Sequence, residues 1–287
     1  MRFSVITPSF RNSDWLKLCV ASVADQGVAC EHIVQDAGSD DGTLDWLTRD
    51  ARVKVFVEKD SGMYDAVNRG LRRAEGDILS YLNCDEQYLR GALAAVETFF
   101  AGNPQVDVLF ADFVVVDADG NYRFHRKVQT PTLYHTWVAH LPAFTCGTFF
   151  RRRIISELGI FFDPKLRAVG DAEWMLRLLR QRVRMAVLRR FTSAFTLTGE
   201  NLGQTPEGLR EAEELFNSAP LWARRLKPLL VLQHRLRRLA GGIYFQKPFS
   251  YSIYTRKNPA KRTIHEVTKP KSRWTWGHGE RVGPADR

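Results

Sequence analysis

The sequence of 287 residues contains only four cysteines, and they are scattered along it at Cys19, Cys30, Cys84 and Cys146. No two of them form a CxxC pair, and their spacing does not match a disulfide scaffold or a cysteine-rich zinc site. We therefore expect the thiols to be free and the protein to work in a reducing compartment, the cytoplasm.

Long apolar segments are also missing, although apolar residues make up 44% of the chain and aromatic residues 11%. No run approaches the roughly 18 residues that cross a bilayer. The first ten residues, MRFSVITPSF, lack the apolar core and the small-residue cleavage site of a signal peptide. The composition predicts a globular cytoplasmic protein with one large domain or two.

Acidic residues become scarce near the C-terminus, and the net charge of +10 comes from that region. Residues 221–287 contain 16 Lys or Arg and 3 Asp or Glu, whereas residues 1–220 contain 26 and 29. The basic character therefore belongs to the tail, and the partner that it indicates need not be the substrate of the body.

Apolar runs of strand length alternate with helical patterns through the first 111 residues. The runs at 3–7, 31–35, 53–57, 77–82 and 106–111 predict strands, and apolar spacing within 14–26, 63–74 and 90–100 predicts helices. Strands that alternate with helices across short loops indicate an α/β fold with a mostly parallel central sheet and flanking helices.

The pattern changes after Asp112. Residues 113–127 predict a hairpin that turns near Gly120, and residues 168–181 predict an amphipathic helix. From Pro206 to Ala240 the chain is mainly helical, and beyond Gly242 it is aromatic and basic. We predict one domain over 1–205, with halves at 1–115 and 116–205, and an extension over 206–287 that is helical and then basic.

Polar clusters occupy the loops that follow the first four predicted strands. They read TPSFRN (7–12), DAGSDDGT (36–43), DSGMYDAVNRG (60–70) and NCDE (83–86). Loops that follow parallel strands emerge at one edge of the sheet and can line a single crevice. The first loop is not GxGxxG, which argues against a dinucleotide-dependent oxidoreductase, and it lacks the Gly-rich basic loop of a sugar nucleotidyltransferase.

In this order, these motifs resemble the nucleotide-sugar-binding half of glycosyltransferase family 2, whose members are inverting enzymes with the Rossmann-like GT-A fold. The resemblance covers residues 1–115 closely and continues loosely to about residue 200. It implies a metal-dependent glycosyltransferase that moves a sugar from a nucleotide-diphosphate sugar, a UDP-sugar above all, to a glycan or lipid-linked acceptor in cell-surface polysaccharide synthesis. The alternative is a non-catalytic nucleotide-binding module with the same fold.

The resemblance assigns the loop after the fourth strand to the DXD-type motif. Asp85 would hold Mn²⁺ or Mg²⁺ against the donor diphosphate, because hard cations take oxygen ligands and neutralise the charge of a departing diphosphate. Asn83 replaces the first acid and would face the ribose or the diphosphate. Cys84 stands between them as a small residue at the strand end, and the role of Glu86 is open.

The other three loops match family positions that contact the nucleotide. Thr7, Pro8 and Ser9 would offer backbone contacts to the nucleoside, and Asp36 would accept a hydrogen bond from the base or ribose. The remaining matches are Gly38 and Ser39, where the backbone would approach the ligand closely, Asp60, and the Asn68-Arg69-Gly70 corner. Arg69 would bind phosphate or be a solvated helix residue.

An inverting transfer also needs a carboxylate that takes the proton from the attacking hydroxyl. The family motif before an Arg-bearing helix matches GDAEWMLRL, with Asp171 as the base and Glu173 as the reserve. The position of Asp171 also suits a helix cap. On the acceptor side, Cys146-Gly147 replaces the His-Gln pair of many relatives. His125, His135 and His140 are more typical of surface or structural positions than of ligands.

The basic tail interleaves cations with aromatic residues. Within 222–240, Trp222, Leu226, Leu229, Leu236 and Leu239 fall roughly on one side of a helix that Pro228 interrupts. This pattern favours an anionic membrane surface over nucleic acid, and it predicts a peripheral position at the inner face of the membrane. A tail that packs on the body or forms a dimer contact is the other interpretation, and the oligomeric state is open.

Overall fold

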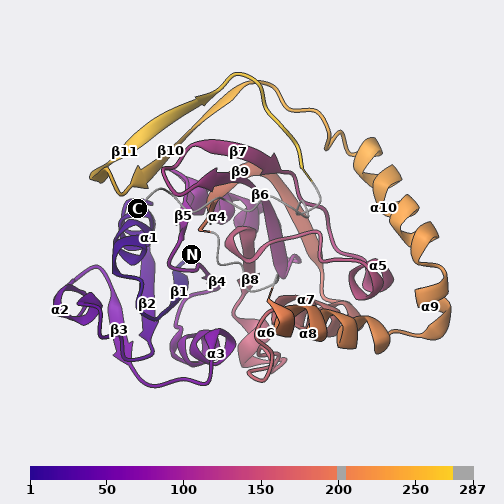
Figure 1. The fold of residues 1–287 in the computed structure, drawn as a ribbon, viewed down its shortest axis with the longest axis horizontal. Coiled ribbons are helices and arrows are strands. Elements are labelled where there is room, and N and C mark those ends of the chain that lie inside the picture. The colour runs from indigo at the N-terminus through magenta and orange to yellow at the C-terminus, as the bar shows by residue number, and fades with distance from the viewer. Residues whose placement is uncertain (199–204, 274–287) are drawn as a thin grey trace.

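The computed structural model describes residues 1–198 and 205–273. Among these residues, nine strands form a central sheet in the order β3-β2-β1-β4-β8-β6-β9-β5, with β7 paired to β6 (Figure 1). Helices flank the sheet, and a separate two-stranded hairpin crosses above it. The α/β class expected from the alternating pattern is confirmed.

The first four strands run in one direction. β1 (Phe3–Ser9) pairs in parallel with β2 (Cys30–Asp36) and β4 (Ile78–Tyr81), and β2 pairs in parallel with β3 (Lys54–Val57). The connections contain α1 (Ser13–Ala24), α2 (Thr43–Leu47) and α3 (Met63–Arg73). All seven residues of β1 are buried, as in a strand covered on both faces. The loops that leave these strands therefore meet at one edge.

The second half of the sheet is mixed. β8 (Thr148–Arg151) lies between β4 and β6 (Val108–Asp117) and runs antiparallel to both. β6 pairs in parallel with β9 (Met185–Leu197), which pairs antiparallel with β5 (Glu86–Tyr88). The expected hairpin is formed by β6 and β7 (Tyr122–Arg126), with Gly120 in the left-handed region at φ +86°. Parallel pairing therefore dominates only in the first half of the sheet, because β8 runs antiparallel to both of its neighbours.

The remaining helices of the body are α4 (Ala92–Gly102), α5 (Leu133–Val138), α6 (Arg153–Ser156) and α7 (Gly170–Arg180), with a short 3₁₀ turn, η1 (Thr145–Gly147). The amphipathic pattern within 168–181 corresponds to α7. Trp174 of α7 is buried and stacks on Phe162 with ring centroids 4.8 Å apart and planes at 21°. This aromatic contact anchors α7, whose second residue is the predicted base, Asp171.

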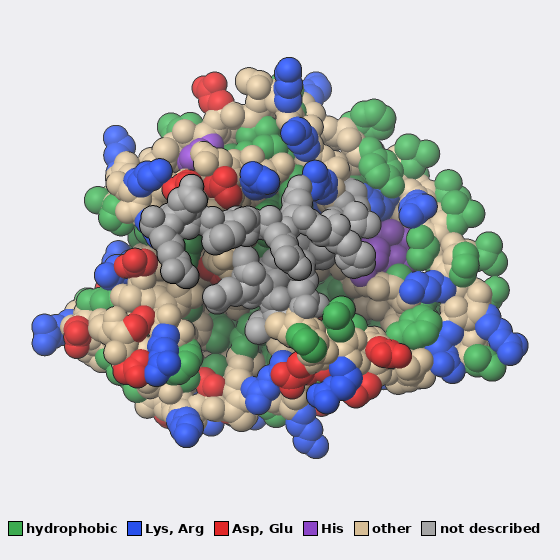
Figure 2. Space-filling model, in the orientation of Figure 1, with side chains coloured by type: hydrophobic (Ala, Val, Ile, Leu, Met, Phe, Trp, Pro, Cys, Tyr) green, Lys and Arg blue, Asp and Glu red, His purple; other side chains and the backbone are tan. Residues whose placement is uncertain are grey.

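The C-terminal region wraps around the body. It contains α8 (Pro206–Asn217), α9 (Leu221–Arg225), α10 (Lys227–Ala240), β10 (Phe249–Thr255) and β11 (Asn258–Val267). The β10–β11 hairpin, which the sequence did not indicate, buries Tyr251 and Ile253 against apolar residues of the central sheet. α9 and α10 form an outer edge of the molecule, where green apolar and blue basic side chains intermingle (Figures 1 and 2).

No helix within the two described ranges is both long enough and apolar enough to cross a bilayer. The longest, α10, has 14 residues and contains several arginines. A helix of that length measures about 21 Å, which is shorter than the hydrocarbon layer.

Glu211 of α8 fixes the segment that leads into α7. Its buried carboxylate accepts hydrogen bonds from the backbone N–H groups of Arg167 at 2.7 Å, Ala168 at 2.9 Å and Val169 at 3.2 Å. Hydrogen bonds to a charged acceptor are stronger than neutral ones. α8 is therefore part of the structure that sets the position of α7, although it lies beyond residue 205.

We expect Glu211→Ala to lower the free energy of unfolding by about 2–3 kcal/mol, because three backbone donors lose a charged acceptor in a buried position. Urea denaturation measures this change. Glu207→Ala is the matched control, since Glu207 lies exposed on the same helix, and it should change stability by less than about 0.5 kcal/mol. Equal denaturation midpoints for the two variants would contradict the role given to Glu211.

Candidate functional site

A pocket of about 510 Å³ opens at the edge where the four parallel strands end. Its volume lies within the range of small-molecule sites in proteins. All four loops contribute to it, the loop after β2 through Ala37. Of the predicted binding residues, it is lined by Pro8, Ser9, Asp60, Asn83, Cys84 and Asp85, and not by Asp36, Gly38 or Ser39. The parallel direction of β1 to β4 thus brings together residues that are up to 77 positions apart in the sequence.

Oxygen atoms with unused hydrogen-bonding capacity gather at the start of β5. Asn83 and Asp85 line the pocket, and Glu86 lies fully buried behind them. Glu86 accepts a hydrogen bond from the Asn83 backbone N–H at 2.9 Å. The other Glu86 oxygen, Oε1, and the Asn83 Oδ1 are buried and have no hydrogen-bond partner in the described ranges. Such groups are costly to bury unless a ligand completes them.

Two carboxyl groups share this position. Burial raises the pKa of Asp85, and burial together with the charge of Asp85 raises the pKa of Glu86. Two neighbouring carboxylates in a poorly solvated site resist simultaneous ionisation. A cation would relieve this repulsion, and oxygen donors of this kind suit Mg²⁺ or Mn²⁺. The chemistry of the donor set therefore fits the divalent cation that the sequence predicts.

Asp36 is fully buried and fixes the loop after β2. Its Oδ1 accepts hydrogen bonds from the backbone N–H groups of Gly38 at 2.9 Å and Ser39 at 2.7 Å, and its Oδ2 accepts from the hydroxyls of Ser9 and Ser39, both at 2.8 Å. Gly38 adopts φ +92°, which favours glycine. Asp36 thus ties the end of β1 to the loop after β2.

Three other predicted residues are engaged away from the pocket. Thr7 is buried and hydrogen-bonds His32 Nε2 at 2.8 Å. Asn68 is buried and contacts Phe162 twice, donating to its carbonyl at 2.8 Å and accepting from its N–H at 2.9 Å. Arg69 pairs with Asp65 at 2.9 Å and Glu58 at 3.4 Å. Asn68 therefore joins α3 to the segment before α7, and Arg69 serves ion pairs on the surface of α3.

Cys84 has a structural contact. Its Sγ donates to the Pro8 carbonyl at 3.1 Å, and burial raises the pKa of the thiol well above its usual value. A buried thiol that stays protonated is a poor nucleophile. Cys84 therefore helps to join the ends of β1 and β4 and lines the pocket as a small side chain.

Sequence reasoning missed Lys59, which lines the pocket beside Asp60. Lys59 is a cation at the strand end of β3, where a phosphate-bearing ligand would be held. Lys59 directly precedes Asp60, a predicted binding residue, and this position is the signal by which the sequence could have identified it. The pocket is also lined by Phe10, Asn12, Met63 and Thr198, and the last of these lies just past the end of β9.

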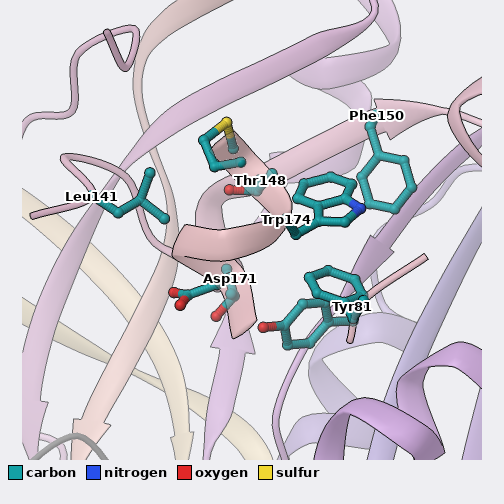
Figure 3. Close-up of a pocket in the computed structure, with 9 residues that line it drawn as sticks. Tyr81, Leu141, Thr148, Phe150, Asp171 and Trp174 are labelled. Carbon is teal, nitrogen blue, oxygen red and sulfur yellow. The ribbon is translucent and has the colours of Figure 1, made fainter. Parts of the chain in front are cut away.

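Asp171 lies in the first turn of α7 and faces a second, much smaller cavity of about 10 Å³ (Figure 3). The labelled side chains of Leu141, Thr148, Phe150 and Trp174 surround it, together with Tyr81. Burial in these mostly apolar surroundings raises the pKa of Asp171 to about 6. A volume of this size holds about one water molecule. There is room beside Asp171 for a hydroxyl group and not for a sugar ring.

α7 begins in close contact with α3, which fixes Asp171. The Tyr64 hydroxyl accepts a hydrogen bond from the Asp171 backbone N–H at 3.2 Å. Gly170 packs on the Tyr64 ring so closely that a Cβ at that position would lie 2.5 Å from Cε2. Asp171 also accepts a hydrogen bond from the Ala172 N–H at 2.8 Å. The helix cap that its sequence position suited is wrong, because Val169 is the N-cap of α7 and no side chain caps this end.

Glu173, the reserve candidate, points its carboxylate at Arg177. The two form a bidentate pair with distances of 2.8 Å from both Nε and Nη2 of Arg177. Glu173 does not line either the pocket at Asp85 or the cavity at Asp171. Of the two candidates, Asp171 is the one whose side chain lines a cavity.

Tyr81 connects the two sites. It lies at the end of β4, two residues before Asn83, and lines the cavity that Asp171 faces. Burial raises the pKa of Tyr81 well above its usual value, and the charges of Tyr64, Asp171 and Glu86 act in the same direction. Tyr81 therefore shares a cavity with Asp171 and lies within electrostatic reach of Glu86.

Comparison with known proteins identifies a family, a relative of similar sequence and solved structures of similar fold. The family model described as Glycosyl transferase family 2 matches residues 4–159. A protein of Mycobacterium bovis (strain BCG / Pasteur 1173P2), named PGL/p-HBAD biosynthesis glycosyltransferase, is 28% identical over 183 residues, which cover 61% of this chain and 68% of that protein.

Solved structures share the fold. Residues 1–349 of S. aureus TarS in complex with UDP-GlcNAc match with a TM-score of 0.59 at 18% identity, covering 84% of this chain and 73% of that one; the match spans 44% of a longer TarS chain. The mannosyltransferase PcManGT from Pyrobaculum calidifontis, in complex with GDP-Man and Mn²⁺, matches with a TM-score of 0.54 at 17% identity, covering 84% and 79%. The architecture expected from the sequence, a GT-A-like α/β fold, is confirmed.

Proposed function

The chain belongs to glycosyl transferase family 2 and is a glycosyltransferase, and from this premise we propose that it transfers a sugar from a UDP-sugar to a membrane-associated glycan or lipid-linked acceptor. The observation that carries the proposal is the 510 Å³ pocket, in which Asn83, Asp85 and Lys59 meet. The UDP-GlcNAc complex of TarS supports the choice of donor. The family membership sets aside both a nucleotidyltransferase and a non-catalytic module.

The donor diphosphate would lie in this pocket. Asp85 is the proposed ligand of a divalent cation, and the unpartnered oxygen of Asn83 is available to the same ion or to a donor hydroxyl. When bound, Mg²⁺ or Mn²⁺ would stabilise negative charge on the departing diphosphate. Lys59 contributes positive charge from the opposite loop. The Mn²⁺ in the PcManGT complex supports a metal of this class.

Asp171 is the proposed general base. In an inverting transfer, its carboxylate takes the proton of the acceptor hydroxyl while that oxygen attacks the anomeric carbon and the nucleoside diphosphate leaves. A base works best when its pKa lies near the working pH, and burial moves the pKa of Asp171 from the ordinary value of 3.8 to about 6. Glu211 acts as a positioning residue through the backbone before α7.

A donor screen tests this assignment. We expect release of nucleoside diphosphate with UDP-sugars in the presence of Mn²⁺ or Mg²⁺, and a loss of at least about 100-fold in Asp85→Ala, because several kcal/mol of charge stabilisation are removed. Asp45→Asn, on the exposed side of α2, is the control and should keep full activity. Turnover that survives both Asp85→Ala and Asp171→Ala would overturn the proposed site.

The pH dependence tests Asp171 separately. The base must be ionised, and its pKa is raised, so kcat/KM for the acceptor at saturating donor should fall about tenfold per pH unit below about pH 6 and level off above it. Asp171→Asn should lose about 100- to 10,000-fold above about pH 6, and its residual activity should not show the fall below that pH. A wild-type profile that stays flat from about pH 5 to about pH 8 would contradict a base with this pKa.

The outer face of α10 supports a membrane-associated acceptor. Leu229, Leu232, Leu236 and Leu239 recur at helical spacing and are 51–60% exposed, and Phe245 beyond the helix is 72% exposed. Six Lys or Arg and no Asp or Glu occur between residues 221 and 245. Pro228 does not break this helix, because it lies in the first turn, where its missing N–H has no helical partner.

An exposed apolar stripe flanked only by cations fits the interface of an anionic bilayer. Apolar side chains would enter the acyl boundary, and each nearby Lys or Arg would contribute about 1 kcal/mol. We therefore assign the outer face of α10 to an anionic membrane surface.

Co-sedimentation with liposomes tests the membrane face. We expect binding to vesicles that contain phosphatidylglycerol, weaker binding at high salt, and a loss of about tenfold or more in Leu236→Glu, since an apolar anchor becomes an anion. Leu209→Glu is the matched control, because Leu209 is 61% exposed on α8. Equal binding of neutral and anionic vesicles, or equal loss in the two variants, would contradict the assignment.

A further inference from the structure

α10 packs on the body in an unusual way. A surface helix normally buries its apolar stripe, but within the described part of the chain the buried side chains of α10 are His234 and Arg238, and four of its five leucines are exposed. The fifth, Leu230, is half-buried and packs against the apolar cluster of Val138, Ala219 and Ala223. Its neighbour in the body is α5. Polar side chains therefore form much of the contact that holds this helix, beside the apolar contact of Leu230.

His234 lies against two histidines from α5 and the loop after it. The ring centroids of His135 and His234 are 3.9 Å apart, those of His135 and His140 are 4.7 Å apart, and those of His140 and His234 are 5.4 Å apart. One nitrogen atom from each ring can be chosen so that all three lie within 4.8 Å of one another. Three imidazoles from two segments that lie at least 94 positions apart in the sequence thus converge.

The two inner imidazoles have unused hydrogen-bonding groups. His135 is 1% exposed and His234 is 4% exposed, and both nitrogens of each ring lack a hydrogen-bond partner among residues 1–198 and 205–273. Leaving a buried polar group unpaired is costly, so four such atoms in one place indicate an absent partner. Burial lowers the pKa of His135 to about 4 and that of His234 to about 3, so both rings are neutral and can donate a lone pair to a metal.

We propose that His135, His140 and His234 bind one transition-metal ion of the Zn²⁺ class, and that this ion fastens α10 to α5. Three imidazoles and one solvent ligand form a common tetrahedral zinc set. His140 is exposed, so solvent can reach the fourth position from its side. The rings of His135 and His234 lie nearly parallel, at 16°, and one of them must rotate about its side-chain bonds for both lone pairs to meet the ion.

Arginines near the three histidines favour an anionic fourth ligand on the proposed metal ion. Arg126 of β7 and Arg237 and Arg238 of α10 act electrostatically on these histidines. Three neutral imidazoles leave the ion its full charge of +2, which these guanidinium groups oppose. An anionic fourth ligand, hydroxide or chloride, offsets that repulsion. The same arginines disfavour protonation of the imidazoles, which keeps the ligands available.

This site differs in chemistry from the proposed donor site. Asp85 and Asn83 offer oxygen atoms, which suit Mg²⁺ or Mn²⁺, whereas imidazole nitrogens favour Zn²⁺, Co²⁺, Ni²⁺ or Cu²⁺. Binding of the histidine-site metal would stabilise the docked position of α10, because the ligands come from both sides of the contact. The ion would thereby hold the apolar stripe of α10 in a fixed orientation on the molecule.

The test uses the untagged full chain and Zn²⁺ alone, measured by competition with a chromophoric chelator in excess Mg²⁺. We expect one Zn²⁺ per chain, and an affinity lower by at least about 100-fold in His135→Gln and His234→Gln, since loss of a ligand exceeds the effect of a second-shell change. His265→Gln is the control, because His265 lies on β11, outside the cluster. Co²⁺ should give the visible bands of a tetrahedral site, without the near-ultraviolet band of a thiolate ligand.

Hydrogen–deuterium exchange gives a second readout. We expect amides of residues 229–240 to exchange at least about tenfold faster after chelation, and Zn²⁺ to restore the slow rate in the wild type but not in His140→Gln. His140 is exposed, so this variant should fold even if a buried histidine cannot be replaced. Zn²⁺ binding that is equal in the wild type and all histidine variants, a thiolate band with Co²⁺, or exchange in α10 that ignores Zn²⁺ would each overturn the proposal.

Discussion

The common direction of β1, β2, β3 and β4 is the constraint on which the rest of the structure depends. Parallel strands deliver their following loops to one edge, and this edge carries the pocket lined by Ser9, Asp60 and Asp85. Asp36 stabilises the arrangement, because its four hydrogen bonds join the end of β1 to the loop after β2. The reversed strand β8 then ends this parallel set and brings the second half of the chain beside it.

Burial gives the carboxylates of this region different roles. Asp36 has all its acceptor sites filled by the protein, and it works as a structural group. Glu86 and the amide of Asn83 keep oxygen atoms without a partner in the described ranges, next to Asp85 at the pocket. Asp171 lies among apolar side chains, and burial there raises its pKa to about 6. Acceptors that the protein fills thus belong to the scaffold, whereas the unfilled acceptors and the desolvated Asp171 are the ones that we propose as ligand site and base.

The C-terminal helices α8 and α10 both contact the body through polar side chains. α8 supports the catalytic half from outside it, since Glu211 holds the backbone before α7. α10 directs four of its five leucines outward and its His234 inward, which is unlike ordinary helix packing. An outward apolar stripe needs a partner such as a membrane, and an inward histidine cluster needs a partner such as a metal ion. A membrane and a metal ion would each stabilise the position of α10, which the body alone would hold weakly.

The sequence by itself determined the α/β class, the first four strands, the hairpin at 113–127 and the loops that line the pocket, because apolar period and turn residues are local signals. Only the tertiary structure decided that β8 runs in reverse, that Asn68 and Arg69 serve structural contacts, and that Lys59 faces the pocket. It also decided that residues 249–267 form a hairpin on the sheet and that three separated histidines meet. These features depend on which distant segments come into contact, and local pattern carries no information about such contacts.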